Sequence, residues 1–404
     1  MSPSRRGSAT EVAAIPRLRS LDGLRGLAAA AVVLHHCLML WTPFANFTLR
    51  GAPPGEFGTA AWLATSTPLS VLVAGPAFVI VFFVLSGIAV VLPALRQGFD
   101  WWAYYPRRVV RLLLPVGASV VLATVVAVTT APLRADEPNG WLAALSPQPP
   151  SWTSFVRTLD VTSGEGRVNS PLWSIEWELW FSFALPLFAI LATVARGRLA
   201  AMSAVGTIIV AWLGYQTDAP AMRYLAPFAL GALIVGNLPS IRAFTQRRLG
   251  PLAWSLILVA ACAGMAADGW VYGATLTQEG WYHCAEALIP LCSAVIVLGA
   301  LLWAPLRALL ETRFFQWLGR ISFSLYLVHV PIVLASGRLI GSEHWLRAIA
   351  VALPVSILLA VLFERFVEAP AHRLSKQVGA AVSARMRDHD PTARSTSPRP
   401  RRSR

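Results

Sequence analysis

Charged residues are scarce in this chain. Asp, Glu, Lys and Arg make up 13% of its 404 residues, whereas a soluble domain carries about 25%. Apolar residues make up 56%, and they gather in long runs along the whole length. These two features exclude an ordinary soluble enzyme and favour a membrane protein that crosses the bilayer several times.

Cysteine is also scarce, and no two of the four cysteines form a CxxC pair. This excludes a disulfide framework or a zinc cluster, so we expect buried thiols and no metal. The net charge of +14 does not indicate a nucleic-acid partner, because the basic residues lie between apolar runs and in the tail. Membrane proteins place arginine and lysine in such positions. The four cysteines are Cys37, Cys262, Cys284 and Cys292.

Ten apolar runs predict an all-α polytopic membrane protein, a bundle of about ten transmembrane helices. The run at 60–75 is interrupted by Pro68 and Pro76, so we expect a re-entrant or surface segment there. No cleaved signal peptide is predicted, because the first run is long and leads into further spans. The ten spans lie near 24–42, 76–95, 110–130, 172–194, 199–216, 222–238, 251–267, 285–304, 321–340 and 346–366.

The distribution of basic residues predicts the orientation of the chain. With the N-terminus in the cytoplasm, 27 basic residues fall inside and seven outside, as the positive-inside rule requires. We therefore expect both termini to be cytoplasmic. Lys376 is the one lysine among 34 basic residues, a bias that favours a GC-rich bacterial genome and hence a bacterial cell membrane. Residues 1–20 are predicted to form a cytoplasmic tail, 21–374 the membrane domain and 375–404 a disordered basic tail.

The first span carries ionisable side chains that lipid does not tolerate without a reason. At about 100° and 1.5 Å per residue, Arg25 and His36 share one helical face and lie about 16 Å apart, whereas His35 lies about 80° away from Arg25. Ionisable groups at this depth usually face a cavity or a partner and have a function. The alternative is an Asp22–Arg25 pair at the helix end and a histidine that is hydrogen-bonded between helices.

Two further segments place polar residues at helical spacing. Arg108 and Arg111 lie three apart at the entrance to the third span, where they suit either phosphate binding or ordinary membrane anchoring. In NSPLWSIEWELWF, 169–181, Ser174 and Glu178 lie four apart within a crowd of aromatic residues that is typical of the outer interface. Glu178 is therefore expected toward the outer side.

A second polar stripe lies near the end of the membrane domain. In GRISFSLYLVHVP, 319–331, Ser322, Tyr326 and His329 occupy positions i, i+4 and i+7 of one helix. A row of three is less readily explained by packing than a single polar residue.

Two shorter motifs complete the pattern. FFVLSG, 82–87, offers a small Ser86–Gly87 step where helices or a ligand can approach closely. In FERFVEAP, Glu364 and Glu368 occur together with Arg365, and Arg373 follows, which we interpret as cytoplasmic ion pairs.

In this order the motifs resemble the membrane-bound acyltransferase 3 family, from Leu21 to about Arg373. The motifs are LDGLRG followed by His36, FFVLSG, RRVVR with a following proline, PLWSIEWE, and SLYLVHVP followed by EAP. The resemblance implies an acyl-CoA-dependent O-acyltransferase, in which an acyl group, often acetyl, moves to a hydroxyl of a carbohydrate, glycolipid or metabolite. Two positions depart from the family: Ile80 stands where a polar residue is frequent, and Glu176 where a small residue is usual.

The resemblance also implies the site residues. Our hypothesis makes His36 the general base on the acceptor hydroxyl, with Tyr326 or Ser322 donating to the thioester oxygen. Glu178 would orient the acceptor or a histidine, and a transient acyl-histidine is a second route. The implied catalytic set is His36, Arg25, Glu178, Tyr326, Ser322 and His329, and the implied donor-binding set is Arg25, Arg108 and Arg111.

Acyl-CoA is expected as a substrate, and no permanently bound cofactor is predicted. The expected partners are a hydroxyl-bearing glycan, glycolipid or metabolite and the lipid bilayer. The alternative function is a transporter or flippase for a glycolipid or small metabolite. Repeated halves with broken helices at matching positions would favour it, and the sequence has no internal repeat.

Overall fold

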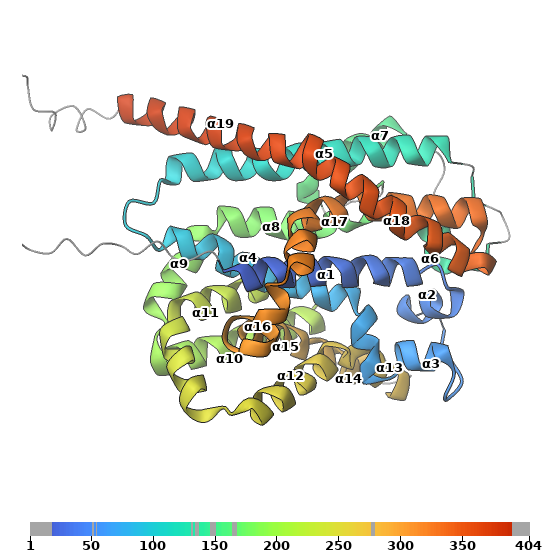
Figure 1. Cartoon of the computed structure of the whole chain (residues 1–404), viewed down its shortest axis with the longest axis horizontal. Helices are drawn as coiled ribbons and strands as arrows, with labels where there is room; N and C mark the ends of the chain where they lie inside the picture. The colour runs from blue at the N-terminus through green and yellow to red at the C-terminus, as the bar shows by residue number, and fades with distance from the viewer. Residues whose placement is uncertain are drawn as a thin grey trace, which may run out of the picture.

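The computed structural model describes residues 18–50, 52–53, 55–130, 132–133, 137–145, 151–163, 168–275 and 279–389. Every regular element within these residues is a helix, and most of the helices run roughly parallel to one long axis (Figure 1). The prediction of an all-α membrane bundle is confirmed.

Eight helices in the described part of the chain are long and apolar enough to cross a membrane. The count becomes nine if a bent pair of helices is taken as one span, close to the ten that hydropathy predicted. The eight are α1 (Arg19–Leu38), α4 (Gly75–Ala94), α5 (Trp101–Thr129), α10 (Gly197–Gln216), α11 (Pro220–Arg248), the stretch His283–Leu302 that contains α15 (Leu288–Leu302), α17 (Arg313–Ile340) and the continuous stretch Ser342–Asp388.

Two predicted spans differ from the expectation. The run at 172–194 forms two helices, α8 (Trp173–Phe183) and α9 (Leu185–Val194), which meet at an angle of 64°. Pro186 follows the break and has no N–H to continue the helical ladder. The run at 251–267 forms α12 (Pro251–Met265), whose 15 residues reach about 22 Å, less than the hydrocarbon core of about 30 Å.

The segment 60–75 is, as expected, no further span. It forms two six-residue helices, α3 (Ala60–Thr65) and a 3-10 helix (Pro68–Val73). The predicted disorder of 375–404 is wrong for its first part, because α19 (Ala369–Asp388) runs through it. Residues 390–404 lie outside the described residues.

A close packing partner explains why α19 is helical. It lies along the first half of α5 (Figure 1), and its buried residues are small and recur every four positions. Small residues at this spacing let two helix backbones approach closely. The composition of the tail is polar, but its pattern provides one continuous contact face. These residues are Ala371, Ser375, Gly379 and Ser383.

The core of the bundle is centred on α17. In its most apolar window, 78% of α17 is buried, whereas the corresponding share is 17% for α10. α17 packs against α1, α5 and α18 (Trp345–Phe363). The polar stripe on α17 therefore faces protein, and α10 presents its apolar side chains to lipid.

The backbones of α1 and α17 are in contact. A Cβ atom on Gly26 would meet the backbone of Leu318 and Gly319, and a Cβ atom on Gly319 would meet the Asp22 carbonyl oxygen. Glycine at both positions permits this approach. It brings the two polar stripes that the sequence revealed, one on each helix, against each other.

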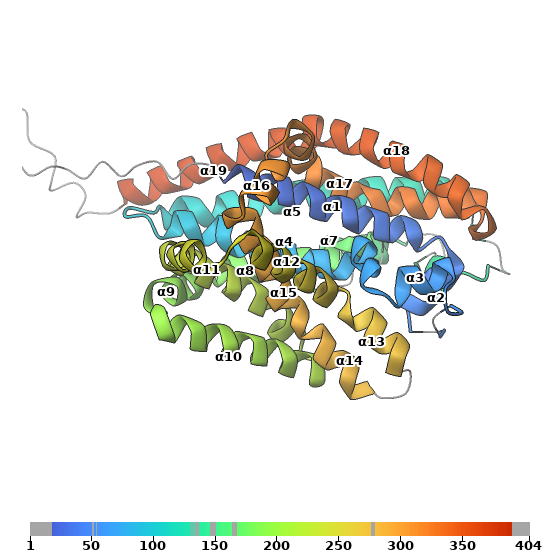
Figure 2. The same ribbon diagram turned by 60° about the horizontal axis from the view of Figure 1, so that its bottom comes forward.

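The two ends of the described chain lie toward the same end of the bundle. α1 begins and α19 ends toward the left in both views, whereas α2 (Thr42–Thr48), α13 (Ala267–Thr275) and α14 (Glu279–Glu286) lie toward the right (Figures 1 and 2). That the left end faces the cytoplasm stays a prediction from the distribution of arginine.

Candidate active site

A cavity of about 160 Å³ lies among α1, α4, α5, α8, α17 and the π-helical turn that follows α18. Its lining combines charged groups, hydroxyl groups and apolar side chains, which is the mixture found in sites for small molecules. The charged residues are Arg25, Arg108, Arg111, Glu178 and Glu368, and the residues with hydroxyl groups are Ser86, Ser174, Ser322 and Tyr326.

Arg108 and Glu178 form an ion pair inside this cavity, with side chains that are 12% and 15% exposed. Arg108 Nε also donates to Ser182 Oγ at 2.8 Å, and Ser86 Oγ donates to Glu178 Oε1 at 2.8 Å. Glu178 therefore lies beside Arg108 and contacts neither histidine of the predicted site. The structure does not support the alternative in which Glu178 orients a histidine; that it lies toward the outer side and orients the acceptor stays a prediction.

At the Ser86–Gly87 step two helices approach closely, as its small residues suggested, whereas the approach of a ligand there stays a prediction. Ser86 contacts Glu178 at the cavity. A Cβ atom on Gly87 would meet the Phe228 carbonyl oxygen, so α4 and α11 pack closely there. The step fixes the wall of the cavity on the side of α4.

Arg25 and Arg111 differ from Arg108, because neither has a carboxylate within 4 Å among the residues that the structure describes. The expected alternative of an Asp22–Arg25 ion pair is not formed. Glu368 is near enough to act electrostatically on both arginines. Arg111 is exposed although it lines the cavity, so the cavity opens toward the surface at this residue.

Ser322 and Tyr326 of the second stripe line the cavity from α17. Ser322 Oγ donates to the Gly319 carbonyl oxygen of its own helix at 2.8 Å. The Tyr326 hydroxyl donates to the Pro171 carbonyl oxygen at 3.0 Å and lies 2.7 Å from Ser174 Oγ. Tyr326 is thereby held at the inner end of the cavity.

The two predicted histidines meet one turn beyond Tyr326 and do not line the cavity. His36 Nδ1 lies 3.1 Å from His329 Nε2. His329 Nδ1 lies 2.9 Å from the Leu325 carbonyl oxygen, so we assign its hydrogen to Nδ1 and a lone pair to Nε2. His36 Nδ1–H then donates to His329 and to Val32 O, which is 3.0 Å away.

This assignment leaves the Nε2 lone pair of His36 available. No hydrogen bond to that nitrogen is present in the described part of the chain. His329 is fully buried, whereas His36 is partly exposed. His35 has a different role, as its spacing predicted: its Nδ1 lies 2.7 Å from Val73 O, and its ring packs against Phe44.

Glu368 was missed by the sequence analysis, which assigned it to cytoplasmic ion pairs. It forms no ion pair with Arg365 or Arg373 and instead lines the cavity, where Ser324 Oγ donates to its Oε2 at 2.5 Å. It ends a π-helical turn, Glu364–Glu368, and such turns are frequent at functional sites. The feature of the sequence that could have identified Glu368 is the EAP motif, of which it is the first residue.

The described residues contain no group of three or more His, Cys, Asp or Glu that can hold a metal ion. All four cysteines are free thiols. The expectation that they are buried holds for Cys37 but is wrong for Cys284, which is exposed.

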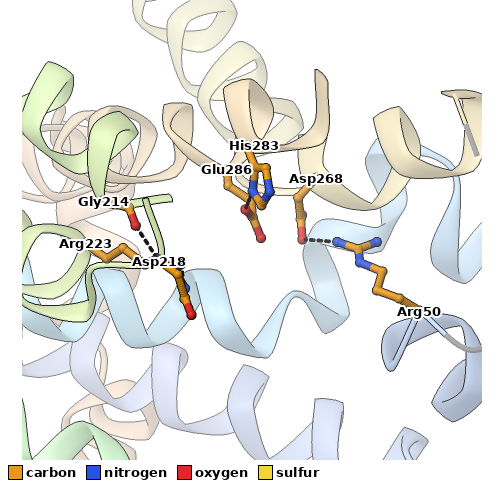
Figure 3. A network of polar contacts seen from close by, with 7 residues as sticks. All are labelled: Arg50, Gly214, Asp218, Arg223, Asp268, His283 and Glu286. Carbon is orange, nitrogen blue, oxygen red and sulfur yellow. Dashed lines mark hydrogen bonds and ion pairs between the residues drawn. The ribbon is translucent and has the colours of Figure 1, made fainter. Parts of the chain in front are cut away.

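A separate polar network lies among α2, α10, α11, α13 and α14 (Figure 3). Arg50 Nη2 lies 3.5 Å from Asp268 Oδ2, and Arg223 Nη2 donates to Asp218 Oδ1 at 2.6 Å. His283 Nδ1 lies 2.9 Å from Glu286 Oε2 (3 residues apart). The Arg50–Asp268 contact joins the end of α2 to α13, whereas the other two pairs lie within α14 and at the start of α11.

The fold and the site define a class of protein: a multi-pass membrane protein with an arginine-lined cavity and a contacting pair of histidines. The acyltransferase 3 family model, described as an acyltransferase domain, matches residues 18–365, and the chain belongs to this family. The predicted family and enzyme class are confirmed. The chain is an acyltransferase that transfers groups other than aminoacyl groups.

Two proteins of known name are similar to the chain over most of their length. The chain is 26% identical to O-acetyltransferase PaAT-1 of Phomopsis amygdali, over 86% of this chain and 80% of that protein. It is 25% identical to acyltransferase MdmB of Streptomyces mycarofaciens, over 89% of this chain and 93% of that protein. No solved structure matches the chain.

Proposed function

We propose that the protein moves an acetyl or other small acyl group from acyl-CoA to a hydroxyl of a carbohydrate, glycoconjugate or glycosylated metabolite, in a bacterial cell membrane. Family membership and a relative named O-acetyltransferase support the acyl group and the oxygen acceptor. The observation that carries the choice of donor is the cavity with Arg25 and Arg111, two arginines without carboxylate partners. Guanidinium groups suit the phosphates of coenzyme A.

The donor enters at the open end of the cavity, beside Arg111. Its thioester arm extends past Arg25 toward Tyr326, which lies at the inner end. The Tyr326 hydroxyl, or Ser322, donates a hydrogen bond to the thioester oxygen as negative charge develops there. Both hydroxyls bond to carbonyl oxygens in the structure, so each exchanges that bond for the substrate.

His36 serves as the general base through Nε2. Its lone pair takes the proton of the acceptor hydroxyl, and the hydroxyl oxygen attacks the thioester carbon. The carbon–sulfur bond breaks, and the proton passes from His36 to the thiolate of coenzyme A. His329 positions His36, because the contact between His329 Nε2 and His36 Nδ1 orients the ring. In the second route, His36 carries the acyl group between two such steps.

Transfer of radiolabelled acetyl from acetyl-CoA tests this proposal. The purified protein in nanodiscs is incubated with extracts of its own cells, and label on a glycan or small metabolite is followed together with free thiol. We expect His36→Ala to lower the transfer rate by about 10²- to 10⁴-fold. His344→Ala, at an exposed histidine outside the cavity, serves as the matched control.

Near wild-type transfer by correctly folded His36→Ala protein would overturn both roles of His36. Absence of transfer by the wild-type protein from several acyl-CoA donors, with its own extract supplied, would overturn the choice of donor.

A further inference from the structure

Four basic residues, three of them cations and the fourth a histidine, lie where α5 and α19 pack, beside the open end of the cavity. α5 carries Arg107 and Arg111, and α19 carries His372 and Lys376. Each pair is four residues apart and so lies on one helical face. The charges of Arg111, Lys376 and Arg107 all act on the side chain of His372, so the two faces are directed toward each other.

The helix contact fixes this arrangement. A Cβ atom on Gly379 would lie 3.3 Å from Arg107 Cβ, and Ser383 Oγ donates to Asp100 Oδ2 at 2.5 Å. Lys376 lies one turn before Gly379 and hence near the level of Arg107. The centre of the contact consists of small residues, so the long basic side chains extend from its edge, where Arg107 and Lys376 are exposed.

These four basic residues have no carboxylate within ion-pair distance in the part of the chain that the structure describes. Glu368 and Glu178 act on Arg111 from inside the cavity. Asp100, two turns before Arg107, is held by Ser383 and by Arg387 at 3.6 Å. Like charges that face each other across two helices destabilise the contact, and an anion between them would offset that cost.

We propose that Arg107, Arg111, His372 and Lys376 bind the phosphates at the nucleotide end of the acyl-CoA donor. This inference rests on the function proposed above and adds the part of the donor that lies outside the cavity. Arg111 belongs to both groups, since it lines the cavity and also faces His372. One ligand can therefore extend from this basic cluster to Tyr326. Headgroups of anionic lipids carry the same phosphate chemistry, and the experiment separates the two sources.

The test compares two donors with the same thioester, acetyl-CoA and acetyl-pantetheine, of which only the first carries phosphates. KM is measured for both with the full-length wild-type protein and the double variant Arg107→Gln, Lys376→Gln in nanodiscs. The control is Arg385→Gln, an exposed cation of α19 that is nine residues from Lys376 and therefore about 180° around the helix.

We expect the KM of the double variant for acetyl-CoA to rise about tenfold, because two charge-assisted contacts to phosphate are lost. The KM for acetyl-pantetheine stays at the wild-type value. The donor ratio, defined as the KM for acetyl-pantetheine divided by the KM for acetyl-CoA, therefore falls. Arg385→Gln keeps the wild-type ratio. The thermal unfolding midpoint of each variant shows that the fold is retained.

A wild-type donor ratio in the folded double variant would overturn the inference and leave the proposed function intact. The inference would also be overturned if the donor ratio is unchanged but the double variant loses a stimulation that the wild-type protein shows in phosphatidylglycerol nanodiscs relative to phosphatidylcholine nanodiscs. The cluster would then bind lipid headgroups. If the wild-type protein turns over neither donor, the proposed function fails, and the inference fails with it.

Discussion

The cavity and the polar network at the opposite end of the bundle use the same residue types in different ways. In the network, Arg50 and Arg223 each have a carboxylate partner (Figure 3). In the cavity, Arg108 has one, whereas Arg25 and Arg111 have none in the described part of the chain. The arginines with carboxylate partners are locally neutralised, whereas Arg25 and Arg111 leave positive charge at the cavity, which is the basis of the proposed phosphate binding.

The two regions also differ in the burial of their ion pairs. The Arg108–Glu178 side chains are 12% and 15% exposed, whereas those of Arg223 and Asp218 are 18% and 90% exposed. A buried pair whose partner is removed leaves an uncompensated charge, and this costs far more than the loss of an exposed pair. Matched substitutions in the two regions can therefore test the comparison.

The largest effect is expected from Glu178→Gln. This change leaves Arg108 buried without its countercharge and should lower the free energy of unfolding by about 3 kcal/mol. Asp218→Asn should cost less than about 1 kcal/mol, because that carboxylate is exposed to water. Thermal unfolding in one detergent compares the two variants, and equal shifts would contradict the distinction.

A smaller effect is expected from replacing an arginine by lysine. Arg25→Lys keeps the charge but loses the planar guanidinium group that grips phosphate or developing negative charge. We expect the acyl-transfer rate to fall about 100-fold, comparable to the loss of one donor to a developing oxyanion. Arg50→Lys, at the network, should transfer at the wild-type rate. An active Arg25→Lys enzyme would show that charge alone suffices.

The smallest effect concerns Arg50→Gln and depends on pH. Burial raises the pKa of Asp268, and Arg50 opposes that rise. A carboxyl group whose pKa is higher in the folded state favours folding at low pH, and this contribution is lost as the pH rises through the folded pKa. Without Arg50 the pKa rises further, so ionised Asp268 becomes more costly.

Arg50→Gln should therefore destabilise the protein by up to about 1 kcal/mol near neutral pH and by less as the pH falls. A constant remainder comes from the loss of the Arg50 contact over the Tyr272 ring, 4.1 Å from its centroid. Unfolding midpoints of the wild-type and variant proteins across a pH series provide the measurement. A difference that grows at low pH would contradict the sign.

Helical periodicity predicted which residues share a face, and these predictions hold where one helix is concerned. Ser322 and Tyr326 both reach the cavity, and His36 rather than His35 meets His329. The predictions failed where a partner far along the chain decides the role. Glu178 pairs with Arg108, which is 70 residues away, and Glu368 meets Ser324, 44 residues away.

Hydropathy had a similar limit for the fold. It located the apolar helices, but it could not show that α12 is too short or that α8 and α9 are bent, because both depend on where a helix ends rather than on its composition. It also missed α19, since a stripe of small residues has little hydrophobicity and gains its packing energy from contact with α5.

The sequence by itself determined the class of protein, the positions of the helices and the polar residues that lipid would not tolerate unaided. These follow from composition and periodicity, which are local properties of the chain. Only the tertiary structure decided which arginines are paired, that the histidines lie beyond the cavity, and that α19 brings further basic residues beside Arg111. Such pairings depend on helix crossings, and the spacing along any one helix does not encode the charge that faces it from another.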